Sequence, residues 1–140
     1  MKIYTIGFTK KSAQEFFEIL KDNNIEQVVD IRLNNTSQLA GFTKKRDLEF
    51  FLKELGPIEY IHLDILAPDK ELRKIKDWEE YSPKYLELIE KRDILNVINP
   101  DIFQKRSCLL CSEPSAEDCH RSILADYLKK HWENVKVVHL

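Results

Sequence analysis

Short apolar runs alternate along this chain with stretches in which apolar residues recur every three or four positions. The runs are rich in β-branched and aromatic residues, which is typical of buried strands. They cover residues 2–6, 25–31, 58–63, 107–112 and 135–140. The stretches between them have the spacing of amphipathic helices. This alternation predicts an α/β fold, a three-layer sandwich with a mainly parallel five-stranded sheet and helices on both faces, in a single domain over residues 1–140.

Capping patterns predict where several helices begin. Ser12 and Glu15 have the spacing of a capping box ahead of the first helical stretch. We expect Thr43 to cap the second helix, and Pro83 to stand at the first position of a long third one. The pattern is weakest over residues 64–81, which we expect to form an irregular surface segment with some helix.

Composition narrows the classes of protein to consider. The chain has 22 basic and 24 acidic residues and a net charge of −2, so we expect no strong non-specific attraction to nucleic acid or anionic membranes. No apolar run approaches the roughly 18 residues of a membrane span, and the first residues read as a strand rather than a signal peptide. Three cysteines give no disulfide framework. These features predict a cytoplasmic protein with reduced thiols, and they leave its oligomeric state open.

Residues with reactive or charged side chains collect where the predicted strands end. In an open parallel sheet, ligands bind outside the carboxyl ends of the strands. The candidates at these ends are Gly7, Asp30, Arg32, His62, Cys111 and Glu113. Asp30 and Arg32 are two residues apart, so their side chains face the same side of a strand. They either form a structural ion pair or have separate roles, one orienting a neighbouring group and the other binding an anion. We expect Cys111 and Glu113 on the pocket side, and Cys108 on the opposite face, in the core.

The final predicted helix starts close to a second group of candidates. If Asp118 caps it, then Cys119, His120 and Arg121 occupy its first turn, where free amides favour an anion or a thiolate. Ser115 and Asp118 also have capping-box spacing, which would start the helix earlier. In the alternative interpretation, Cys119 is a small core residue and Arg121 is a surface cation.

Other uses of these and neighbouring residues stay open. Cys111, Cys119, His120 and His62 could form a zinc shell, although a second CxxC pair is missing. The chain also lacks a Cys-x5-Arg loop and a Gly-rich phosphate loop. Lys44 begins a basic triplet beside Phe42 that either contacts phosphate groups or forms a solvated helix start. Three aromatic residues either cover the pocket or pack in the core: Trp78, Tyr81 and Tyr85.

Several motifs together resemble the family catalogued as domain of unknown function 488. They are TIGFT, VVDIR, GFTKKRDLEFFL, EYIHL and LLCSEPSAEDCHRSILADYL, in this order over nearly the whole chain. The resemblance implies a compact α/β fold with a polar pocket at the strand ends, and brings no established activity. The chain departs from the family at Phe8, where a histidine is frequent, and at Leu66-Ala67-Pro68, where Leu-Gly-Gly is frequent. We expect the second change to alter the pocket mouth. The signature positions are Asp30, Arg32, Cys111, Glu113, Cys119, His120 and Arg121.

The leading hypothesis is an enzyme-like domain that binds a small anionic or nucleotide-like ligand. Arg32 and Arg121 would hold the anion, with Gly7 and Lys44 nearby, and Cys111 or Cys119 would supply a thiol. Glu113 or Asp30 would act as acid or base, and His120 or His62 would move a proton. No cofactor is indicated. The alternatives are a non-catalytic module that binds nucleic acid or a protein, and a structural zinc protein.

Overall fold

Five parallel strands form the sheet at the centre of the molecule. The computed structural model describes residues 1–34, 41–112 and 119–140. The strand order is β3-β2-β4-β1-β5, and every neighbouring pair is parallel. This confirms the predicted α/β class and the five-stranded parallel sheet. The strands are β1 (Lys2–Gly7), β2 (Gln27–Asp30), β3 (Glu59–His62), β4 (Ser107–Cys111) and β5 (Lys136–His139).

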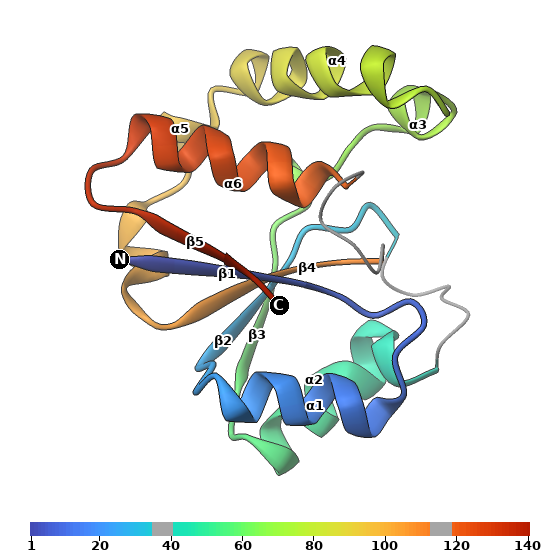
Figure 1. Cartoon of the computed structure of the whole chain (residues 1–140), viewed down its shortest axis with the longest axis vertical. Helices are drawn as coiled ribbons and strands as arrows, with labels where there is room; N and C mark the ends of the chain where they lie inside the picture. Colours follow the sequence, from blue (N-terminus) through green and yellow to red (C-terminus); the bar gives the residue numbers. More distant parts are fainter. Residues whose placement is uncertain (35–40, 113–118) are drawn as a thin grey trace.

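Helices cover both faces of the sheet (Figure 1). On one face lie α1 (Ala13–Asp22) and α2 (Lys45–Leu55), and on the other α4 (Trp78–Lys91) and α6 (His120–His131). Cys108 packs in the core beneath α1 and α2, whereas Cys111 packs with the core beneath α4 and α6. The two cysteines therefore face opposite sides of β4, as predicted. Among the described helices, none has the length and apolar character needed to cross a bilayer.

The short elements are α3 (Lys70–Arg73), α5 (Ile94–Val97) and three 3-10 turns, η1 (Gly41–Thr43), η2 (Asp64–Leu66) and η3 (Pro100–Gln104).

The first helix begins as expected, because the Ser12 hydroxyl accepts a hydrogen bond from the Glu15 amide and the Glu15 carboxylate accepts one from the Ser12 amide. The prediction that Thr43 caps α2 is wrong. Lys44 holds that position without a side-chain cap, and Thr43 is buried in η1.

The predicted start of the long helix is also wrong, by five residues. Helix α4 begins at Trp78 because the carboxylate of Asp77 accepts a hydrogen bond from the Glu79 amide. Pro83 therefore lies inside the helix. Helix α6 packs directly against β1, β4 and β5, and α4 packs against α6 in the next layer (Figure 1).

Candidate functional site

A cavity of about 440 Å³ opens at the carboxyl ends of the strands. We call it the strand-end cavity. One wall comes from the residues that follow β2 and end β4, and the facing wall comes from the segment that carries α3 and the start of α4. Its main lining residues are Arg32, Leu33, Asn34, Arg73, Ile75, Lys76, Trp78, Tyr81, Cys111, Ser112, Cys119 and His120. Its volume is within the range of about 300–1,000 Å³ that is usual for small-molecule sites.

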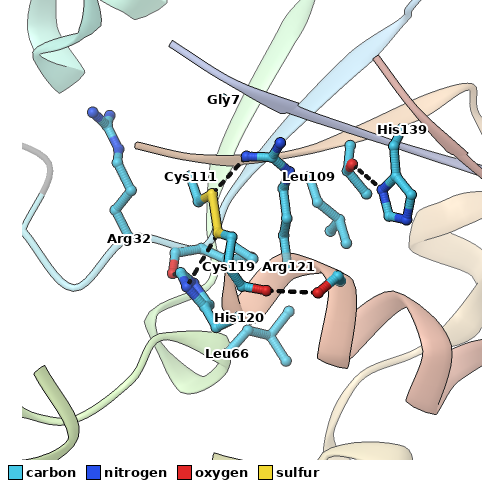
Figure 2. Close-up of a disulfide and its surroundings, with 12 residues drawn as sticks. Gly7, Arg32, Leu66, Leu109, Cys111, Cys119, His120, Arg121 and His139 are labelled. Carbon is cyan, nitrogen blue, oxygen red and sulfur yellow. Dashed lines mark hydrogen bonds between the residues drawn. A yellow bond between two sulfur atoms is a disulfide. The ribbon is translucent and has the colours of Figure 1, made fainter. Parts of the chain in front are cut away.

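Two sulfur atoms lie at the base of this cavity. Cys111, at the end of β4, and Cys119, directly before α6, form a disulfide (Figure 2). The prediction of reduced thiols is therefore wrong for these two residues, because the start of α6 lies beside the end of β4 and brings their side chains together. Arg121 is completely buried and donates from Nη1 to Sγ of Cys111 over 2.9 Å. A guanidinium at this distance stabilises negative charge on the sulfur when the pair is reduced.

The disulfide can be checked by counting thiols. We expect the denatured, unreduced protein to show one thiol, that of Cys108, and the reduced protein to show all three. In the native protein we expect Cys108 to stay unreactive, because burial raises the pKa of its thiol. Ellman's reagent gives all of these counts. Three thiols before reduction would contradict the pairing.

His120 lies beside Cys119 in one defined tautomer. Its Nε2 is 3.0 Å from the carbonyl oxygen of Ile31, so this nitrogen carries the proton and donates. Its Nδ1 is then unprotonated and lies 3.8 Å from Sγ of Cys119. Burial lowers the pKa of His120 from 6.5 to about 4, so the ring is neutral at physiological pH. In the reduced protein, this neutral Nδ1 can accept a hydrogen bond from the Cys119 thiol.

This pKa predicts how stability depends on pH. The unfolded chain takes up a proton at His120 below pH 6.5, whereas the folded protein keeps the ring neutral down to about 4. The free energy of unfolding should therefore be highest above 6.5 and fall by up to about 3 kcal/mol as the pH drops through this window. Urea unfolding of the wild type and His120→Gln across this range measures the difference. An equal pH dependence in both proteins would contradict the assignment.

Asp30 and Arg32 form a buried ion pair at the end of β2. Nε and Nη2 of Arg32 donate to the two carboxylate oxygens of Asp30, each over 2.8 Å, and Nη2 also donates to the carbonyl oxygen of Thr43. The Tyr60 hydroxyl donates to the same carboxylate over 2.5 Å. The guanidinium of Arg32 also lies over the ring of Phe8. The ion pair that the sequence analysis gave as one of two alternatives is therefore present, and it holds the side chains of Asp30 and Arg32 in one orientation.

Comparison with known proteins places this site in a family. A family model described as domain of unknown function DUF488 matches residues 12–128 of the 140-residue chain. The chain belongs to the DUF488 family. The match covers Asp30, Arg32 and the whole sulfur site. No curated protein and no solved structure shows significant similarity to the chain.

The structure of this DUF488 protein brings only some of the predicted residues to the cavity. Cys111, Cys119, His120 and Arg32 line it, whereas Arg121 lies behind Cys111. In Figure 2 the Arg32 guanidinium points away from the sulfur pair. Among the described residues, its buried Nη1 has no hydrogen-bond partner. The catalytic and ligand-binding roles of all these residues stay predictions.

The remaining candidates of the DUF488 site that the structure describes do not line the cavity. Asp30 is held in the ion pair, and Nε2 of His62 is 2.8 Å from the carbonyl oxygen of Arg32. Gly7 ends β1, where its carbonyl oxygen accepts from Nζ of Lys11. Lys44 is exposed at the start of α2, and Glu113 lies outside the described residues. Within the described ranges, no three His, Cys, Asp or Glu side chains gather as a metal site would require.

Two cations on the far wall were not among the candidates. Arg73 ends α3 and Lys76 follows it, and both line the strand-end cavity. In the sequence they stand within a run of charged residues, which is the usual pattern of a solvated surface. Only the folding of this segment over the strand ends distinguishes them from neighbouring cations.

Proposed function

We propose that this DUF488 protein is an enzyme-like domain that binds a small anionic or nucleotide-like ligand in the strand-end cavity. The observation that carries the proposal is the composition of the cavity wall. Two cations, Arg73 and Lys76, line the same cavity as the sulfurs of Cys111 and Cys119. Neither cation makes an ion pair or hydrogen bond with a described residue, so both are available to an anion.

We further propose that a thiol takes part in the chemistry once the pair is reduced. The two sulfurs then have different neighbours. Arg121 favours the thiolate at Cys111, and Nδ1 of His120 lies where it can accept a hydrogen bond from the thiol of Cys119. A thiolate favoured by a guanidinium, in a cavity that two cations also line, is suited to reaction with the electrophilic centre of an anionic substrate.

Alkylation of the reduced protein tests this proposal. The rates at which iodoacetamide modifies Cys111 and Cys119 are followed by peptide mass spectrometry, across pH and with or without inorganic phosphate or AMP. We expect one thiol to react well below about pH 8.5, where a free cysteine titrates, and both anions to slow its reaction. Cys108, buried on the other face of β4, serves as the internal control.

Two results would count against the proposal. Thiols that stay silent until alkaline pH would remove the nucleophile and favour a non-catalytic binding module. Alkylation rates that do not change with saturating phosphate or AMP would show that neither anion occupies the cavity. The Cys111→Ser and Cys119→Ser variants then identify which sulfur carries any reactivity at neutral pH.

A further inference from the structure

We infer that the ligand of the strand-end cavity is a nucleoside phosphate whose base stacks on Trp78 while its phosphate contacts Arg73 and Lys76. This inference rests on the proposed function and narrows it, because the ligand must then carry an aromatic base as well as a negatively charged group. Its basis is a row of stacked aromatic side chains, Tyr85, Tyr81 and Trp78. The outer two, Tyr81 and Trp78, line the cavity together with these two cations.

The row consists of parallel rings on one face of α4. Trp78 and Tyr81 are stacked with ring centroids 5.5 Å apart and planes 15° apart. Tyr81 and Tyr85 are stacked in the same way, at 6.2 Å and 14°. Positions three and four apart lie on the same side of a helix, so the spacing of these residues brings their rings together. The result is a preformed stack whose planes are nearly parallel.

The inner end of this stack is fixed. Tyr85 is completely buried, and its hydroxyl donates to the carbonyl oxygen of Leu66 over 2.6 Å. Its ring and that of His120 meet edge to face, with centroids 5.4 Å apart. Because Tyr85 is held in this way, Tyr81 and Trp78 are stacked on a rigid base. Both of these outer residues are only partly buried and line the cavity.

A planar base fits this wall better than a bare anion does. The cavity of about 440 Å³ corresponds to about fifteen water molecules, far more than one phosphate group displaces. Stacking on an aromatic side chain accepts any base, because every base has a π face. Trp78 can stack on the base of a nucleotide, and Lys76 and Arg73, two and five positions before it in the sequence, can contact the phosphate.

The acidic residues near Trp78 do not line the cavity, so they would not repel a phosphate bound in it. Asp77 caps α4 with its carboxylate, and Glu80 pairs with Lys84 on the exposed side of the helix. Neither of these residues, nor Glu79, is part of the cavity lining. The charged residues that line the described part of the wall are Arg32, Arg73 and Lys76, and the ring of His120 beside them is neutral.

Tryptophan fluorescence tests the inference directly. The chain has two tryptophans, and Trp132 packs against Phe103, so Trp132→Phe leaves Trp78 as the reporter. The reduced protein is titrated with AMP, with ribose 5-phosphate, which has the same charge but no base, and with adenosine. We expect AMP to quench Trp78 and to bind about 5- to 100-fold more tightly than ribose 5-phosphate. Adenosine should bind weakly because it lacks the anion.

Variants separate stacking from structural effects, with binding measured by calorimetry where Trp78 is replaced. Trp78→Ala should lower the affinity for AMP to that for ribose 5-phosphate, whereas Trp78→Phe should keep most of the preference. Equal affinities for AMP and ribose 5-phosphate in the wild type would overturn the inference and leave the anion site intact. No binding of either compound would overturn the inference together with the proposed function.

Discussion

Replacing Asp30 with asparagine will lower the free energy of unfolding by about 3–5 kcal/mol, the cost that is usual when one partner of a buried ion pair is removed. Asp30 is completely buried and Arg32 is 3% exposed, so the guanidinium would lose its anionic partner without gaining water. The hydrogen bond from Tyr60 to the carboxylate would also change. Urea unfolding at neutral pH measures the loss.

Two further variants make this result specific. Asp22→Ala removes an exposed carboxylate at the end of α1 and should change stability by about 0.5 kcal/mol or less. Asp30→Asn combined with Arg32→Met removes both charges and should be more stable than Asp30→Asn alone, because no unpaired charge stays buried. A double variant as unstable as the single one would show that the charge of Arg32 is not the cause.

Replacing Arg73 and Lys76 together with alanine will lower the affinity for AMP and for ribose 5-phosphate by about 10- to 100-fold. Each charge-assisted hydrogen bond to a phosphate is worth about 1.5–3 kcal/mol, although exposure of both side chains reduces this at high salt. Because the cations contact the phosphate and not the base, the loss should be similar for both compounds. Isothermal titration calorimetry of the reduced protein gives the two dissociation constants.

The same segment offers a matched control. Lys70→Ala with Lys74→Ala removes the same net charge from exposed positions of α3 and its cap that do not line the cavity. We expect its affinity to stay within about twofold of the wild type, as exposed charges at a distance are screened by salt. If both double variants lose affinity equally, the effect comes from overall charge and the assignment of the cavity wall is wrong.

The local sequence patterns were sufficient to predict the strands of the sheet and which residues lie at their ends. Apolar runs located all five strands, and the period of two along β4 separated Cys108 from Cys111. The spacing of Asp30 and Arg32 showed that they could pair, and the structure contains the pair. These features depend on neighbours a few residues apart, which is the range over which side-chain periodicity carries information.

The far wall of the cavity could not be predicted in this way. Whether Arg73, Lys76 and Trp78 face a cavity or water depends on how residues 64–81 fold across the strand ends, and local periodicity does not contain that information. The start of α4 was missed for a related reason. Asp77, which caps α4, stands in the weakly patterned residues 64–81, whereas proline is common at the first position of a helix and so makes Pro83 the stronger signal.

The pairing of Cys111 with Cys119 also depended on distant geometry. An odd number of cysteines and the absence of a repeated spacing favoured reduced thiols. The contact arises because α6 begins beside the end of β4, which places Arg121 and the two sulfurs in one cluster (Figure 2). The sequence placed these residues near one another and did not indicate a bond between them.

The most direct test of the account is to map where a nucleotide binds. The reduced, ¹⁵N-labelled protein is titrated with AMP and with ribose 5-phosphate, and amide chemical shifts are followed by NMR. The account predicts that the largest changes with both compounds fall at Leu33, Lys76, Ser112 and His120, with additional changes at Trp78 for AMP. Changes confined to the apolar groove between α1 and α2, around Phe17 and Phe51, or no changes at all, would contradict it.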